Sequence, residues 1–202
     1  IRRKKTNGAS TDAETIMNGI NLVLLLSLTV QTAVQASRVV LPLFLLDLGA
    51  GPATVGLLAA TFSLFPALLA VPMGRLVDRR GARLPLIAAS VIGLAGLLVP
   101  FLFRSVWAIF AAGVAISIAT ACLNLTLQNL VGVLSRPEHR PRNFANFSLA
   151  NSTASFIGPV VAGFCIDAFG HGIASAIIAL FFIPALPLLA MGRREDLDRM
   201  TP

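Results

Sequence analysis

One arginine lies inside a long apolar stretch, away from the other charged residues of the chain. Arg38 follows Gln31 by seven residues and Gln35 by three, so a helix would place the three side chains on one face. A guanidinium in hydrocarbon costs about 2.5–3.5 kcal/mol on insertion scales, so it requires a polar cavity or an anionic partner. Asp47 is nine residues away, about 13 Å along a helix, which is too far for an easy ion pair. Arg38 could therefore bind an anionic solute, pair with a carboxylate elsewhere in the protein, or extend its side chain to the outer membrane surface.

Two other apolar stretches carry polar side chains at helical spacing. One contains Asn124 and Gln128, and the other contains Asn151 within a group of serines. Polar groups inside a bilayer must find partners. They either hold neighbouring helices together or line a cavity that accepts a solute. The candidate cavity residues are Gln31, Gln35, Arg38, Asn124, Gln128 and Asn151.

No set of residues predicts catalysis or metal binding. Cys122 and Cys165 both fall in apolar runs, and the chain has only two histidines. These residues do not form a ligand spacing. The sequence also indicates no nucleophile–base pair and no pair of catalytic carboxylates. The sequence therefore predicts a protein that is not an enzyme and that holds neither a metal nor a cofactor.

The composition indicates a protein built into a membrane. Of its 202 residues, 56% are hydrophobic and only 12% are charged, and the mean hydropathy is +0.83. A soluble domain of this size needs a more charged surface. Six apolar stretches are long enough to cross a hydrocarbon core of roughly 30 Å. They are residues 19–46, 52–73, 84–103, 106–134, 143–166 and 173–191.

The charges between these stretches predict how the chain is oriented. Of the 16 lysines and arginines, 14 lie in alternate connections and in the two terminal segments, whereas Arg104 alone lies in an opposite loop. Such a bias places both termini in the cytoplasm, with an even number of spans. It also explains the net charge of +7 without nucleic acid as a partner. The predicted parts are a cytoplasmic tail, an all-α bundle of six transmembrane helices and the start of a cytoplasmic loop, residues 1–18, 19–191 and 192–202.

The chain contains a weak internal repeat with an offset of 89 residues. The pattern Gly-x-x-x-Asp-x-x-Gly occurs at Gly74 and again at Gly163, and Pro52 and Pro141 share the same offset. The offset covers three spans, so the two copies have opposite orientations in the membrane. Inverted three-helix repeats are typical of secondary transporters. We expect two inverted three-helix repeats.

The segment between the second and third spans is a basic turn with a recognisable pattern. It reads Gly74-x-Leu76-x-Asp78-Arg79-x-Gly81-x-Arg83, which resembles the loop signature of the major facilitator superfamily. The resemblance implies the N-terminal six-helix half of a transporter. It also implies that Asp78 and its neighbouring arginines form a latch against the other half, which favours the outward-facing state. Gly74 and Gly81 would allow close approach of the backbone and the turn.

The fifth span carries a second match to the same family. Gly158-Pro159-Val-Val-Ala162-Gly163 resembles the antiporter motif of the superfamily, although it could also be a packing kink. The resemblance implies a proton-coupled exporter that exchanges a small solute by alternating access. The expected partners are that solute, membrane lipid and a C-terminal six-helix half. The expected location is a bacterial inner membrane.

Three other functions stay open at this point. The chain could be a structural or assembly protein with six helices, a half-transporter that works as a homodimer, or a uniporter or symporter of an organic anion. The repeat and the loop signature favour a transporter. The sequence does not identify the solute.

Overall fold

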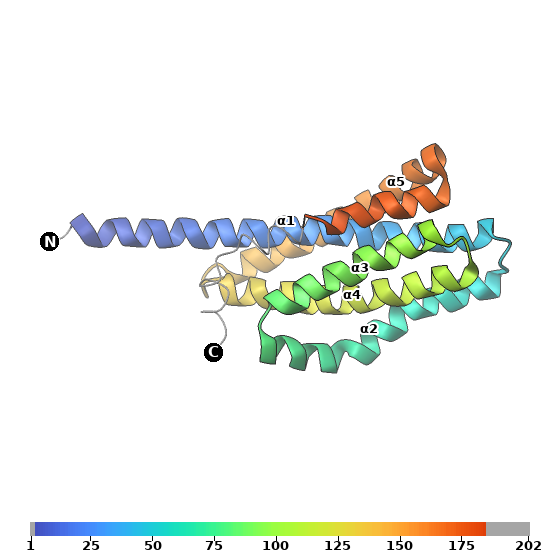
Figure 1. Cartoon of the computed structure of the whole chain (residues 1–202). Coiled ribbons are helices and arrows are strands. Elements are labelled where there is room, and N and C mark those ends of the chain that lie inside the picture. The colour runs from blue at the N-terminus through green and yellow to red at the C-terminus, as the bar shows by residue number, and fades with distance from the viewer. Residues whose placement is uncertain (1–2, 185–202) are drawn as a thin grey trace.

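The computed structural model describes the backbone of residues 3–184 and the side chains of residues 19–77 and 81–184. Within this part the chain is helical, and no strand occurs. Figure 1 shows long helices that lie roughly side by side. They are α1 (Arg3–Asp47), α2 (Pro52–Arg80), α3 (Arg83–Leu102), α4 (Val106–Leu134) and α5 (Arg140–Ala179), followed by the short 3-10 helix η1 (Leu180–Phe182).

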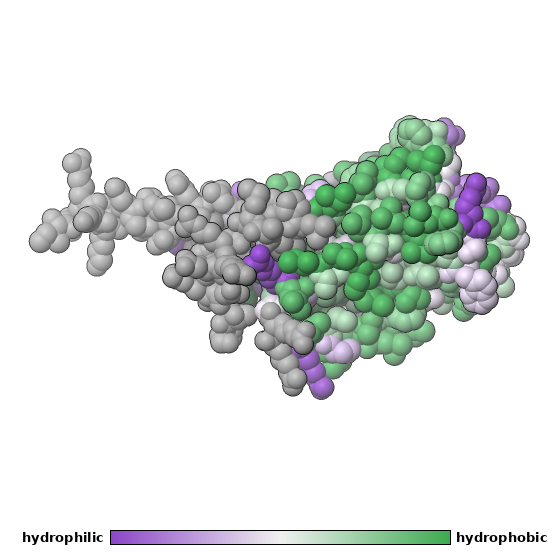
Figure 2. Space-filling view, in the orientation of Figure 1, coloured by the Kyte–Doolittle hydropathy of each residue, from purple (hydrophilic) through white to green (hydrophobic). Residues whose placement is uncertain are grey.

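Each of the five long helices contains a stretch apolar and long enough to cross a membrane. Their outward side chains are apolar too: Trp107 is 83% exposed and Phe164 is 75% exposed. Figure 2 shows an apolar surface over the middle of the molecule, with hydrophilic residues on both sides of it, toward the two ends of the bundle. A water-soluble protein rarely exposes so continuous an apolar surface, whereas lipid covers it at no cost. The architecture is that of an all-α, multi-pass membrane protein.

The core of the bundle forms around α4, which packs against α1, α2 and α3. The most apolar stretch of α4 is 61% buried, against 11% for that of α2. α1 packs mainly on α5. The largest fully buried side chains include Phe44, Leu41 and Ile116. One face of α2 and much of α5 are thus left without a protein neighbour among the described residues.

α5 contains a break that reverses the direction of the chain. Gly170 has φ 78° and ψ 169°, which are not helical angles, whereas the residues before and after it are helical. Figure 1 shows the last part of α5 returning along the bundle from this point. We predicted a turn over residues 167–172, but the helix continues to the glycine itself because only Gly170 has to adopt a positive φ. The sixth span stays a prediction, since its residues 185–191 lie outside the described part, as does the predicted loop 192–202.

One expected boundary is wrong. The basic turn predicted from Gly74 is helical as far as Arg80, and only Gly81 and Ala82 connect α2 to α3. Arginine and leucine favour a helix, so α2 continues beyond its apolar stretch until Gly81, at φ 69°, ends it. At the other end of the sequence, α1 begins at Arg3, and its apolar stretch begins at Gly19, the residue at which the first span was predicted to start.

The backbone has a feature that agrees with the predicted repeat. Gly81 and Gly170 are 89 residues apart, and both break a helix with similar angles, φ 69° and ψ 178° against φ 78° and ψ 169°. Pro52 and Pro141 both lie in the first turn of a helix, where the missing N–H has no cost. α1 and α4 also run in opposite directions (Figure 1). These observations support the repeat, although the arrangement of two three-helix units stays a prediction.

Candidate transport site

Arg38 lies on an exposed face of α1 and turns its guanidinium toward α2. The guanidinium carbon is 5.9 Å from the centre of the Phe62 ring, within the range of a cation–π contact. Phe62 is itself 92% buried, since only 8% of its surface is exposed. The aromatic ring therefore provides a fixed support for the charge. Phe62 was not predicted as a site residue, because nothing in its sequence position distinguishes it from the other apolar residues of α2.

The depth of this contact argues against one of the three interpretations of Arg38, in which its side chain extends to the outer membrane surface. Phe62 is ten residues from Pro52, the start of α2, or about 15 Å along the helix axis. The apolar stretch of α2 spans Pro52–Val77, so the guanidinium lies near its middle. A side chain that extended to the outer surface would instead lie near the first turn of α2.

Two hydrogen bonds join α1 to α5. The Gln35 side-chain amide donates to Ser155 Oγ at 2.6 Å, and the Ser27 hydroxyl donates to Asn151 Oδ1 at 2.9 Å. In a membrane such bonds hold helices together and satisfy groups that lipid cannot. Gln35 and Asn151, both predicted as cavity residues, thus join α1 to α5, and their place in a cavity stays a prediction. Gln35 also keeps a fixed position one turn from Arg38.

The backbones of α1 and α5 come very close at Gly158, the residue before Pro159. A β-carbon added to Gly158 would lie 2.6 Å from Gln35 Cβ, 2.9 Å from Ala36 N and 3.0 Å from Thr32 O. Only glycine fits there. Gly163 differs, because a β-carbon at that position would meet nothing within 4 Å. Of the three residues predicted from the antiporter-like motif, Gly158 packs against α1, whereas Pro159 and Gly163 face outward.

The other predicted cavity residues are spread over the bundle. Gln31 and Asn124 are half-buried, and Gln128 is exposed. Several hydroxyl groups near them bond to their own helix instead of to a neighbour. Ser117 donates to Gly113 O, and Thr120 donates to Ile116 O. These hydroxyls are satisfied without a solute, so they do not mark a cavity.

The structure places part of the loop motif. Gly74 lies in the last turns of α2, where a β-carbon would meet nothing within 4 Å, so it is not a site of close packing. Arg83 begins α3 and is half-buried. Asp78 and Arg79 are not among the residues whose side chains the structure describes. The latch therefore stays a prediction.

A polar group that we did not predict lies at the end of the bundle where α1 terminates. Asp47 Oδ2 is 3.7 Å from Arg104 Nη2 and 3.6 Å from His171 Nδ1. The His171 ring stacks on the buried Phe44 ring with centroids 5.6 Å apart, and the Arg104 guanidinium carbon is 5.7 Å from the same ring centre. The end of α1, the α3–α4 turn and the α5 break thus meet at one carboxylate. The charge distribution predicts that these three segments lie on the same side of the membrane. That prediction could have indicated that they meet.

This group should contribute little to stability. We expect Asp47→Asn to lower the free energy of unfolding by about 1 kcal/mol or less, because 42% of the Asp47 side chain and 67% of the Arg104 side chain are exposed. The effect should shrink at high salt, which screens exposed charges. Thermal unfolding of the purified protein at low and high salt measures it. A loss several times larger would show that the carboxylate is a structural centre.

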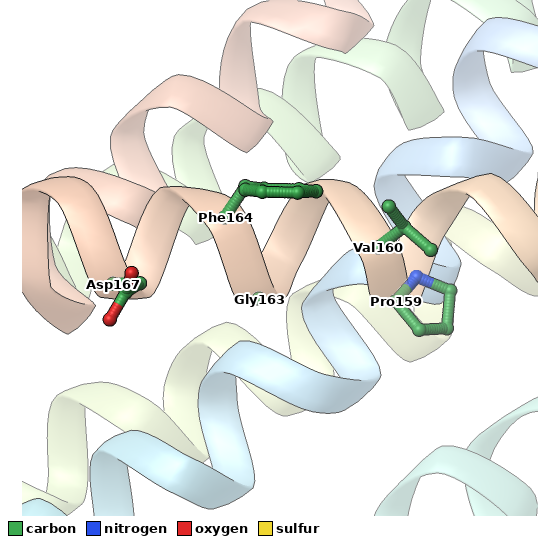
Figure 3. Close-up of a pocket in the computed structure, with 5 residues that line it drawn as sticks. All are labelled: Pro159, Val160, Gly163, Phe164 and Asp167. Atoms are coloured by element: carbon green, nitrogen blue, oxygen red, sulfur yellow. The ribbon is translucent and has the colours of Figure 1, made fainter.

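The face of α5 that carries Pro159 is shallowly grooved. The groove has a volume of about 310 Å³ and is lined by Pro159, Val160, Gly163, Phe164 and Asp167. Figure 3 shows that all five come from α5. Gly163, which lacks a side chain, leaves the gap between Pro159 and Phe164. The groove is therefore a surface feature of one helix and not an enclosed solute site.

A comparison with known families agrees with this architecture. The family model for the Major Facilitator Superfamily matches residues 23–199. A match over most of the chain shows that the chain belongs to the major facilitator superfamily, whose members are membrane transporters. A search of curated proteins finds no match.

Proposed function

We propose that the chain is the N-terminal half of a secondary transporter that moves a small solute by alternating access. The main support is the position of Arg38, a charged side chain on an exposed face of α1, nine residues inside the end of the apolar stretch Gly19–Asp47. Lipid is a costly neighbour for such a charge. A second six-helix bundle opposite this face would enclose Arg38, Gln31 and Gln35 in an aqueous passage. Midplane sites between two halves are typical of such transporters.

The loop motif and the antiporter-like motif give the finer proposal. Asp78 and the arginines beside it would latch the two halves on the cytoplasmic side and favour the outward-facing state. The Gly158–Pro159 element, by its resemblance, supports a proton-coupled exporter in a bacterial inner membrane. The described part of the chain has no carboxylate near the middle of a span, so the proton-binding carboxylate would lie in the other half.

Labelling of single cysteines tests alternating access. In a variant without Cys122 and Cys165, Gln31→Cys and Gln35→Cys should react with a membrane-impermeant maleimide added from either side of the membrane. Conditions that favour one state should raise labelling from one side and lower it from the other. Reaction from neither side would leave a structural or assembly protein as the better function. The same pattern without a second half in the gene product would identify a homodimer.

The predicted topology has its own labelling test. Arg79→Cys should react only from the cytoplasmic side, and His171→Cys only from the opposite side. The physical reason is the asymmetric distribution of lysine and arginine, of which 14 of 16 lie on one predicted side. Labelling of both positions from the same side would contradict the inverted arrangement of α2 and α5.

A further inference from the structure

Arg38 is a cation without an acidic partner among the described side chains. No carboxylate oxygen in that part of the protein lies within 4 Å of its guanidinium, and the ion pairs found there involve Asp47 instead. Asp47 is already shared by Arg104 and His171. Among these residues the charge of Arg38 thus has no compensation, although it lies within the apolar stretch Gly19–Asp47. Its compensation has to come from outside these residues.

The surroundings of Arg38 favour an anion whose acidic group presents two oxygen atoms to the guanidinium. The centre of the Phe62 ring lies 5.9 Å from the guanidinium carbon. The ring supports the cation and leaves N–H groups of Arg38 that can still donate hydrogen bonds to an anion. A guanidinium binds carboxylate and phosphate oxygens through two parallel hydrogen bonds. Gln35, fixed by Ser155 at 2.6 Å, adds a polar group one helical turn away.

We propose that Arg38, supported by Phe62, binds the acidic group of the transported solute, and that this solute is an organic anion with a carboxylate or a phosphate. This inference rests on the proposed transport function and extends it to the class of substrate. In this arrangement Arg38 selects the charge, while Phe62 restricts the guanidinium plane. The solute then provides the negative charge that the bundle lacks.

Binding measurements on the purified protein in lipid nanodiscs test this proposal. The probes are benzoate and phenyl phosphate, with benzamide as the uncharged analogue, all at constant ionic strength. Benzoate and phenyl phosphate distinguish the two acidic groups. Arg38→Gln should weaken binding of the preferred anion about tenfold or more, since a hydrogen bond to a charged group is lost. Arg38→Lys, which keeps the charge but not the paired geometry, should weaken it less. Arg104→Gln is the matched control and should leave binding unchanged.

Three results would overturn the proposal. The first is unchanged anion binding by Arg38→Gln, and the second is binding of benzamide as tight as that of benzoate. The third is an Arg38→Gln protein that unfolds at a lower temperature while the unaltered protein binds neither anion, because Arg38 would then pair with a carboxylate of the protein. Labelling of Gln31→Cys shows whether such a failure concerns only the substrate class or the proposed transport function as well. If the accessibility of this cysteine still alternates, transport stands and only the substrate class fails.

Discussion

Gly158→Ala is expected to lower the free energy of unfolding by about 1–3 kcal/mol, the usual range for overpacking a tight interior. The added methyl group would lie 2.6 Å from Gln35 Cβ and 2.9 Å from the backbone nitrogen of Ala36. A backbone atom cannot rotate away as the end of a side chain can. α1 and α5 would have to separate, which would also lengthen the Gln35–Ser155 hydrogen bond. Gly158→Leu should have a larger effect.

The same helix offers a control for this substitution. Gly163→Ala changes the same residue type five positions away, where an added β-carbon meets nothing within 4 Å. It should leave stability unchanged or raise it slightly, because alanine favours a helix more than glycine does. Thermal unfolding in detergent compares the two variants directly. Equal melting temperatures would mean that α1 and α5 are not in tight contact at Gly158.

Asp78→Asn is expected to lower transport about tenfold with unchanged membrane insertion. On the proposed function, Asp78 accepts charge-assisted hydrogen bonds that hold the cytoplasmic side closed. Each such bond contributes about 1.5–3 kcal/mol, and its loss shifts the equilibrium between the two states by about tenfold or more. Transport in membrane vesicles and labelling of Gln31→Cys measure the two effects. Labelling should increase from the cytoplasmic side.

Asp167→Asn is the matched control for Asp78→Asn. Asp167 occupies the equivalent position in the repeat, 89 residues later, and is exposed at the opposite end of the bundle. Its substitution should not increase labelling from the cytoplasmic side. The latch would be refuted if Asp78→Asn transported as fast as the unaltered protein, or if both variants lost transport equally.

The sequence predicted the membrane helices well where apolar residues meet a strong boundary signal. α2 begins at Pro52 and α4 spans Val106–Leu134, as expected from hydropathy and from the proline. The end of α2 was wrong by seven residues, from Met73 to Arg80. Hydropathy reports where the lipid ends, and a helix can continue into water until a glycine stops it. The internal repeat at Gly81 and Gly170 could have corrected this boundary.

The candidate site was less predictable than the fold. Helical spacing placed Arg38 and Gln35 on one side of α1, and the match to the loop signature indicated the family. The neighbours of Arg38 depend on how α1 and α2 pack, which periodicity does not encode. The contact of Arg38 with Phe62 was therefore not predicted. The contacts of Asp47 with Arg104 and His171 were not predicted either. Asn151 accepts a hydrogen bond from Ser27, a contact that the sequence does not indicate, and its predicted place in a cavity stays a prediction.

The meeting of three chain segments at Asp47 has a mechanical consequence. A displacement of the α3–α4 turn would pull on Arg104, and through the shared carboxylate it would also pull on α1 and on the residues after Gly170. This coupling is weak, because 42% of the Asp47 side chain and 67% of the Arg104 side chain are exposed, so this rim can rearrange at little cost in free energy. The close contact between α1 and α5 lies elsewhere on the two helices, at Gly158, where an added β-carbon would lie 2.6 Å from Gln35 Cβ.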